Sequence, residues 1–277
     1  MIIEESTLLL LEKYNETHHN INQENHVSSR DELEKYFSSQ VQSEFIVIAS
    51  HEMKTSIQAI LTYAELLLDN YDNRKEDYIK AILRNASRLR VLSNNLTDMT
   101  KIDANKLRIK KERFDIVELI SSIVDDFRNM NKHQESKINI SIHSQKHVFV
   151  NADFHRISEV VLNLLDNAIK YTKEGDISIV LEEKQDANYL SISITDTGPG
   201  IDNRIKPNLF NKFATSSHSG TGLGLYICKN IIEAHGGSIW AEDNIDKGGA
   251  NFSFKIPINL DDSNAIYTKF LNSRMEV

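Results

Sequence analysis

The residues best suited to chemistry lie in the second half of the chain, and the first of them form an asparagine pair. Asn163 and Asn167 are four residues apart, so on a helix they share one face. Amide oxygens are neutral, hard ligands that suit a phosphate-bound Mg²⁺. Lys170, on the same stretch, supplies a point charge for phosphates. A solvated helix face would give the same pattern, so this segment alone does not define a site.

Three further segments fit the same task of binding a nucleotide. A strand-like run ends at Asp196, whose carboxylate can accept a hydrogen bond from the amino group of adenine, and Gly198 and Gly200 allow a tight turn after it. Phe210 and Phe213 follow a loop, and taken in isolation they are better explained as core aromatics on a short helix. A glycine loop that runs into an apolar helix presents backbone N–H groups to phosphate oxygens. That loop is Gly220-Thr221-Gly222-Leu223-Gly224.

Two long helices are expected upstream of these segments. From Leu33 to Leu68, apolar residues recur at three- and four-residue spacing, and a second stripe runs from Ile79 to Met99. The polar stretch 69–73 between them is turn chemistry, so the two helices form an antiparallel hairpin. One hairpin cannot cover both apolar stripes. We therefore expect a homodimer in which two hairpins make a four-helix bundle.

The chain beyond residue 113 shows an α+β pattern. Helical spacing alternates with two-residue alternation, which predicts a layer of helices packed on one face of a sheet. A linker near 104–112 separates this part from the hairpin, and the basic stretch from Lys101 to Arg113 is interpreted as solvated. The expected helices cover 119–127, 153–172 and 222–235, and the expected strands cover 138–142, 148–150, 177–181, 190–194, 239–241 and 252–256.

Composition limits the classes of function that remain. With 277 residues the chain has room for two domains, and its formal charge of −8 gives no electrostatic reason to expect a nucleic acid as partner. Cys228 is the single cysteine, which fits a reducing, cytoplasmic compartment. No apolar run approaches the length needed to span a bilayer, so we expect no membrane segment in this chain.

The order of these segments carries a family resemblance. The asparagine pair, Asp-Thr-Gly-Pro-Gly, the two phenylalanines and Gly-Thr-Gly-Leu-Gly closely resemble the ATP-binding domain of sensor histidine kinases. Upstream, the segment from Phe45 to Thr55 is similar to the phosphoacceptor box of the same family. The resemblance runs from Phe45 to Ile258.

This resemblance implies a fold and a division into domains. The expected fold class is α+β: a helical-hairpin dimerisation domain, followed by an α/β sandwich ATP-binding domain of the Bergerat type. The predicted divisions are an N-terminal polar segment at 1–37, the dimerisation and phosphotransfer hairpin at 38–107, the catalytic domain at 108–260 and a tail at 261–277.

The resemblance also implies roles for residues of the first hairpin helix. His51 would be phosphorylated, and Glu52 would orient or deprotonate its imidazole. Thr55 would align a water when the same fold dephosphorylates its partner. Ser56 stands where the family usually has a proline, which puts the bending of this helix in question.

In the ATP site, Asn167 would be the Mg²⁺ ligand with Asn163 beside it. Lys170 would meet phosphate, Tyr171 would flank the base and Asp196 would recognise adenine. The pocket and its lid would be shaped by Gly198, Gly200, Phe210, Phe213, Gly220, Thr221, Gly222, Leu223 and Gly224.

The implied reaction uses Mg²⁺–ATP to phosphorylate His51 and passes the phosphoryl group to an aspartate on the receiver domain of a response regulator. The two domains must approach each other, and the linker near 104–112 is the expected pivot. Three alternatives remain: a hydrolase like gyrase B or MutL, a nucleotide-binding scaffold, and a phosphatase acting through Thr55. The hydrolases place a glutamate four residues before the Mg²⁺ asparagine, whereas this chain has Asn163, whose amide cannot accept a proton.

Overall fold

The computed structural model describes residues 49–50, 52–68, 74–130, 137–144, 147–184, 188–215, 221–244 and 248–258. They divide into two compact units, which we name by their main elements. The helical unit lies within 1–96 and 215–221, and the sheet unit lies within 97–214 and 222–277. The positions predicted before residue 49 and after residue 258 lie outside the described residues.

The helical unit contains the expected hairpin. A helix at 52–68 is followed by α3 (Lys75–Asp103), whose residues from Thr97 onward belong to the sheet unit. Glu52 contacts Arg88, and the ring of Tyr63 lies 5.8 Å from that of Tyr78. The later residue of the first helix, Tyr63, thus contacts the earlier residue of the second, Tyr78. The two helices are therefore antiparallel.

Both hairpin helices leave large apolar side chains in solvent. Leu68 is 82% exposed, and Leu83 is 60% exposed. Contiguous exposed apolar surface is rare on soluble monomers and marks an interaction site. The other exposed large apolar side chains of the two helices are Ile57, Leu61, Leu66, Ile79 and Val91.

The sheet unit is built on a five-stranded sheet with the strand order β2-β4-β5-β7-β6. The pair β2–β4 is parallel, and the pairs β4–β5, β5–β7 and β6–β7 are antiparallel. Strand β5 shows why these segments form a sheet: every second residue is buried, as its sequence alternation predicts. The strands are β2 (Ile138–His143), β4 (Gly175–Lys184), β5 (Tyr189–Asp196), β6 (Ser238–Asp243) and β7 (Ala250–Pro257).

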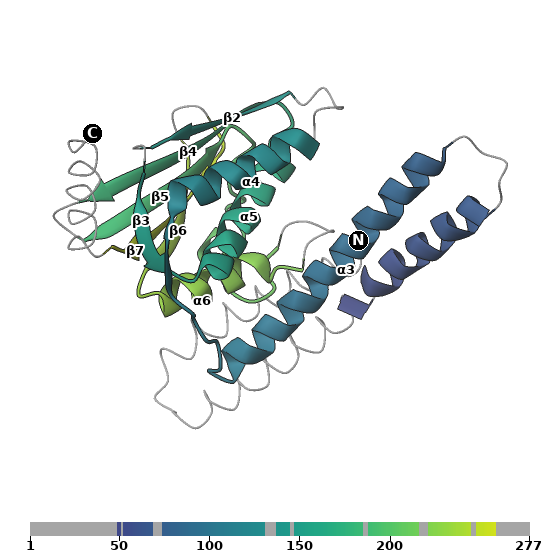
Figure 1. The fold of residues 1–277 in the computed structure, drawn as a ribbon, viewed down its shortest axis with the longest axis horizontal. Coiled ribbons are helices and arrows are strands. Elements are labelled where there is room, and N and C mark those ends of the chain that lie inside the picture. The colour runs from purple at the N-terminus through teal and green to yellow at the C-terminus, as the bar shows by residue number, and fades with distance from the viewer. Residues whose placement is uncertain are drawn as a thin grey trace, which may run out of the picture. The chain divides into compact units, whose positions relative to one another are not determined.

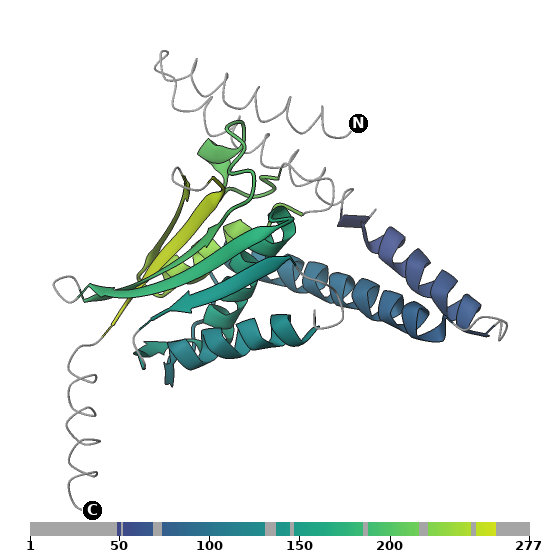
Figure 2. The same cartoon turned by 90° about the horizontal axis from the view of Figure 1, so that it is seen from above.

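Three helices cover one face of this sheet, as Figure 1 shows and the perpendicular view of Figure 2 confirms. They are α4 (Ile116–Met130), α5 (Phe154–Tyr171) and α6 (Gly224–Ala234). The apolar stripe of α5, which includes Ile157 and Leu164, is fully buried against its neighbours. The predicted helix layer on one sheet face is therefore confirmed.

One element differs from the sequence prediction. Strand β1 (Glu112–Asp115) pairs antiparallel with β3 (Phe149–Ala152), so the end of the basic stretch is not an irregular linker. Charged residues occupy three of the four positions of β1, which hides the period-two alternation by which a strand is recognised. Its last residue, Asp115, accepts a bond from the Val117 N–H and so caps α4.

Candidate nucleotide-binding site

The fixed point of the candidate site is the carboxylate of Asp196, at the end of β5. The side chain is buried, and its Oδ1 accepts hydrogen bonds from the N–H groups of Gly198 (2.8 Å) and Ala250 (3.2 Å). Burial raises the pKa of Asp196 above the usual aspartate value, and the two N–H donors oppose that shift. The carboxylate is therefore held rigidly as an acceptor at the edge of the sheet.

Glycines let three chain segments meet around this carboxylate. A methyl group on Gly198 would lie 2.9 Å from Asp196 Oδ1 and 3.0 Å from the carbonyl oxygen of Tyr171. Gly249 has a φ of +94°, and a methyl group there would lie 2.1 Å from the Asp196 carbonyl oxygen. Only glycine fits such close backbone approaches. The end of α5, the turn after β5 and the start of β7 are thus brought together.

Helix α5 carries the asparagine pair. The helix begins after Asp153, whose side chain accepts a bond from the Arg156 N–H at 3.1 Å and satisfies a free donor of the first turn. Asn163 and Asn167 are both half-buried. A methyl group on Gly224, the first residue of α6, would lie 3.3 Å from Asn163 Oδ1. Asn163 therefore faces the start of α6.

Cys228 adds a second contact between Asn163 and α6. The Asn163 side chain lies beside this thiol, and burial raises the thiol pKa well above its ordinary value. The thiol is therefore a neutral packing group. A direct role of Asn163 at the metal stays a prediction.

Lys170 and Tyr171 lie at the C-terminal end of α5, next to the Asp196 turn. Tyr171 is 40% exposed, and Lys170 Nζ lies 5.3 Å from the centre of its ring. The Tyr171 carbonyl packs against Gly198, so this end of α5 lies next to the turn that follows Asp196. The structure thus brings these predicted site residues together.

The base of the glycine loop is braced by its own backbone. The N–H of Phe213 donates to the carbonyl of Gly222 at 2.9 Å, and a methyl group on Gly222 would lie 2.4 Å from the Phe213 carbonyl carbon. Phe213 itself has a φ of +66°, a left-handed conformation that is strained for an aromatic residue. Leu223 is fully buried just before α6, and Phe210 is half-buried. The two ends of the loop are therefore held side by side.

Some of the predicted site residues lie outside this cluster of contacts around Asp196. His51 and Gly220 lie outside the described residues. Thr221 belongs to the helical unit. Gly200, with a φ of +82°, belongs to the adjoining turn, where a methyl group would lie 3.3 Å from Asp243 Oδ1.

The hairpin site is described from Glu52 onward. The Glu52 carboxylate lies 3.3 Å from the guanidinium of Arg88 on α3, and only 11% of this glutamate side chain is exposed. Thr55 is exposed, and Ser56 is buried. An acidic residue beside His51 in sequence is therefore held by a cation from the second helix.

Sequence analysis missed several residues that shape these sites. Arg88 and Gly249 were not singled out, and neither was Asp243, which accepts bonds from the Ile201 N–H (3.0 Å) and Lys206 Nζ (2.6 Å). Each acts on a partner far away in sequence. A pair of glycines before the last strand, Gly248 and Gly249, was the one local signal that pointed to a close backbone approach.

Two family models match the chain in the order that its architecture requires. The His Kinase A (phospho-acceptor) domain matches residues 41–105. The histidine kinase-, DNA gyrase B- and HSP90-like ATPase matches residues 152–260. This chain belongs to the histidine kinase family. The hairpin is thus the phosphoacceptor domain, and the sheet unit contains the kinase-type ATPase domain.

Other histidine kinases and sensor proteins are similar over most of this length. The sensor protein KdpD of Clostridium acetobutylicum is 36% identical over 246 residues, 84% of this chain and 26% of KdpD. The sensor protein SrrB of Staphylococcus aureus is 34% identical over 245 residues, 83% of this chain and 40% of SrrB. This chain thus spans about a quarter to two fifths of the length of these relatives.

Solved histidine kinase structures share the fold. The kinase AdeS of Acinetobacter baumannii is 26% identical with a TM-score of 0.58, and the match covers 76% of this chain and 98% of that one. The kinase ThkA, solved in complex with the response regulator protein TrrA, is 28% identical with a TM-score of 0.57. That match covers 84% of this chain and 66% of ThkA.

Two searches of the described residues bear on membranes and metals. None of their helices is both long and apolar enough to cross a bilayer. In the same ranges, no group of three or more His, Cys, Asp or Glu side chains is arranged to hold a metal ion. The half-buried amide of Asn167 is a donor of the kind that suits Mg²⁺ when nucleotide phosphates supply further oxygens.

Proposed function

We propose that this chain is the kinase core of a sensor histidine kinase, which binds Mg²⁺–ATP in the sheet unit and phosphorylates its own His51. The observation that carries the proposal is the Asp196 carboxylate, buried and fixed by two backbone N–H donors where α5, β5 and β7 meet. A rigid acceptor of this kind suits the amino group of adenine. The amino group would donate a hydrogen bond to the carboxylate in place of the water that burial has removed.

The remaining residues divide the work of phosphoryl transfer. Tyr171 flanks the base, and Lys170 supplies positive charge to the phosphates. Asn167 provides the amide oxygen for Mg²⁺, which when bound neutralises charge on the phosphates. A neutral imidazole nitrogen of His51 attacks the γ-phosphorus, the bond to the bridging oxygen breaks, and ADP leaves.

Arg88 supports the base in this reaction. The imidazole loses its proton as the phosphoryl group is gained, and Glu52 is the acceptor next to it in sequence. Arg88 holds the Glu52 carboxylate at 3.3 Å and limits its orientations. Arg88 is thus a positioning residue, because it acts through Glu52.

The proposal includes partners and a compartment. Exposed apolar side chains on both hairpin helices favour a second copy of the chain, which would bury them in a four-helix bundle. The complex of the similar kinase ThkA with a response regulator supports transfer from His51 to a receiver-domain aspartate. We place these reactions in the cytoplasm, where ATP and Mg²⁺ are available.

Hydrolysis of ATP is disfavoured by the surroundings of α5. Asn163 stands where the gyrase-type enzymes have their water-activating glutamate, and it faces α6 and the neutral thiol of Cys228. The glutamate one turn earlier, Glu159, is bonded to Arg156 at 2.8 Å. Its carboxylate is therefore already engaged in an ion pair, two turns away from Asn167.

Labelling with γ-labelled ATP and Mg²⁺ tests the proposal. The wild type should acquire a label that is labile in acid and stable in base, and His51→Gln should abolish the label while leaving ATP binding unchanged. Asp196→Asn should lower the preference for ATP over GTP by at least about tenfold, because a charge-assisted bond is lost. A wild type that binds ATP but acquires no phosphohistidine would refute the kinase proposal.

A further inference from the structure

A small cavity lies in the sheet unit where the chain entering β1 meets β3, the end of β7 and the end of α6. Its volume is about 80 Å³, and it is lined by Lys111, Asn151, Ala152, His235, Ile256 and Pro257. One enclosed water needs roughly 10–15 Å³ of such space, so the cavity has room for about five waters or for one tetrahedral oxyanion.

This cavity is separate from the candidate nucleotide site. Helix α6 begins at Gly224, next to the glycine loop, and His235 follows its last residue. Eleven residues of helical rise place the two ends about 16 Å apart. A group bound beside His235 is therefore not a part of the nucleotide bound at the glycine loop.

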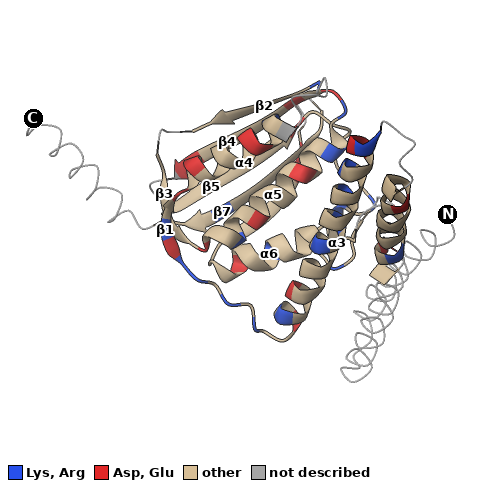
Figure 3. Cartoon of the chain, turned by 45° about the vertical axis from the view of Figure 1, so that its right-hand side comes forward, with Lys and Arg blue, Asp and Glu red and all other residues tan. Residues whose placement is uncertain are grey.

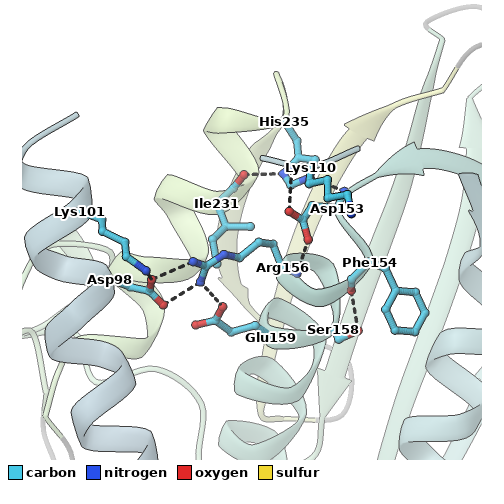
Figure 4. Close-up of polar contacts among 10 residues, drawn as sticks. All are labelled: Asp98, Lys101, Lys110, Asp153, Phe154, Arg156, Ser158, Glu159, Ile231 and His235. Atoms are coloured by element: carbon cyan, nitrogen blue, oxygen red, sulfur yellow. Dashed lines mark hydrogen bonds and ion pairs between the residues drawn. The ribbon is translucent and has the colours of Figure 1, made fainter. Parts of the chain in front are cut away.

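His235 closes the buried side of the cavity without offering a nitrogen to a ligand. Nδ1 donates to the Ile231 carbonyl, and Nε2 accepts the Asp153 N–H, as Figure 4 shows. The side chain is only 3% exposed. The neutral ring is thus a wall, and any charge that a ligand meets comes from the other lining residues.

Lys111 supplies a cation at the mouth of the cavity. Its side chain is exposed, and no carboxylate in the described part of the chain forms an ion pair with it. Burial lowers the pKa of His235, and the Lys111 charge acts in the same direction, so the ammonium is close enough to be felt at the ring. An uncompensated cation at a concave surface attracts anions.

Asn151 adds N–H donors to the same mouth. The Ile116 N–H donates to the Val148 carbonyl at 3.0 Å, so in the β1–β3 ladder the even-numbered residues of β3 bond to β1. The N–H of Asn151 therefore points away from β1, as does that of Asp153, which reaches His235. Among the described residues it has no backbone acceptor, and the side-chain amide of Asn151 offers further N–H groups.

Three more cations precede Lys111 in the chain. Lys106, Arg108 and Lys110 are exposed, and they too form no ion pair with a described residue. Blue segments along the connection from α3 to β1 show this basic row in Figure 3. The whole chain carries a formal charge of −8, so the row is a local reversal of sign that raises the concentration of anions near the cavity.

We propose that this cavity binds a phosphate group, held by the Lys111 ammonium and by the backbone and side-chain N–H donors of Asn151. Charge-assisted bonds from several donors suit a doubly charged oxyanion. The space admits the phosphate group alone, so the ligand is either free phosphate or a phosphate monoester whose carrier stays in solvent. The site is independent of the proposed kinase function.

The ring of His235 reports binding at the cavity itself. In protein labelled with ¹³C at histidine Cε1, the His235 resonance should shift and saturate with inorganic phosphate at constant ionic strength, with a dissociation constant of about 1–10 mM. Because an anion beside the ring favours its charged form, saturation should also raise the pKa of His235. The resonance is identified by its loss in His235→Gln, and chloride at the same ionic strength should leave it unshifted.

Variants of two adjacent lysines test the assigned cation. Lys111→Gln should weaken phosphate binding at least about tenfold, whereas Lys111→Arg, which keeps the charge, should bind within about threefold of the wild type. Lys110→Gln is the matched control, because it removes an equal charge from a residue that does not line the cavity, and it should weaken binding less than about threefold. Both lysines are exposed, so urea unfolding should give wild-type stability for all three variants.

A second titration with glycerol 3-phosphate separates the two sources of the group. Saturation by both ligands assigns the site to phosphate monoesters as well as to the free ion, and saturation by inorganic phosphate alone assigns it to the free ion. The site is overturned if neither ligand shifts the His235 resonance, or if Lys111→Gln binds as tightly as the wild type. Labelling of His51 is unaffected by either result, so failure of this site and failure of the kinase proposal are distinguishable.

Discussion

The two units of this chain bury their apolar surface in different ways. In the sheet unit, helices α4 to α6 cover one face of the sheet, and Leu164 and Ile177 are fully buried within one chain. In the helical unit, Leu83 and Leu68 remain largely exposed although they belong to the same periodic pattern. The described core of the sheet unit is thus buried within one chain, whereas the hairpin leaves its apolar stripe exposed.

Truncation of the sheet-unit core should have the largest effect. Leu164→Ala removes a fully buried side chain from the centre of α5, and we expect it to lower the free energy of unfolding by about 3–5 kcal/mol. Urea unfolding monitored at Trp240 on β6 measures this change. The mass of the dimer should stay unchanged, and a dissociated dimer would show that the two units are not independent.

A charge on the hairpin stripe should give the opposite result. Leu83→Asp replaces a leucine that is 60% exposed in one chain with a carboxylate, which would be buried in the proposed dimer. Loss of the apolar contact on both copies amounts to about 3 kcal/mol or more, before the cost of burying charge. Light scattering should report a monomer, with Trp240 unfolding unaltered.

A substitution at a polar position of the same helix controls for the added charge. Asn94→Asp lies at an exposed position of α3 and should leave the dimer intact. A Leu83→Asp protein that stays dimeric would place the dimer contact somewhere other than the apolar stripe.

The comparison of the two units also shows which parts of the molecule can be predicted from sequence. Periodicity predicted α4, α5 and α6 and the five strands of the main sheet, because each buries one face against one neighbour. The local motifs singled out Asp196, Gly198 and Tyr171, and the structure places the backbone of these residues close together. These features depend on near neighbours in the sequence.

The features that sequence did not predict are tertiary. Asp98 accepts a hydrogen bond from Arg156 at 2.7 Å although the two are 58 residues apart, and nothing in either local pattern selects the other as a partner. In the same way Arg88 finds Glu52 across the hairpin. Strand β1 escaped prediction because its charged side chains mask its alternation, and it is held by pairing with β3. Partner choice of this kind is set by packing, which a single sequence does not reveal.

The smallest predicted effect is a pH dependence of stability that arises from His235. Among the described residues, a buried histidine occurs in the sheet unit alone. His235 Nδ1 donates to the Ile231 carbonyl at 2.7 Å, and Nε2 accepts the Asp153 N–H at 2.9 Å (Figure 4). Both nitrogens are thus committed to the neutral ring. Burial lowers the pKa of His235, the nearby Lys111 charge acts in the same direction, and Asp153 opposes it.

The sign of the pH dependence follows from this lowered pKa. Below about pH 6.5 the unfolded chain binds a proton at His235 that the folded chain does not. The free energy of unfolding therefore decreases as the pH is lowered from about 6.5 to the pKa of the folded state. The slope is at most about 1.4 kcal/mol per pH unit. The pKa of Asp153 is lowered, so its contribution to the stability of the fold is lost only in the more acidic range, below the ordinary aspartate pKa.

Urea unfolding at Trp240 between pH 7.5 and 5.5 measures this effect as a falling free energy of unfolding for the wild type. His235→Gln keeps a side-chain acceptor for the Asp153 N–H but cannot be protonated, so its stability should be lower at pH 7.5 and nearly constant across the range. His155→Gln, at an exposed position of α5, should retain the wild-type slope. If His235→Gln keeps that slope as well, the acid sensitivity of the sheet unit belongs to another group. Dimer mass should not change over this range, because the acid-sensitive bonds of His235 lie wholly within the sheet unit.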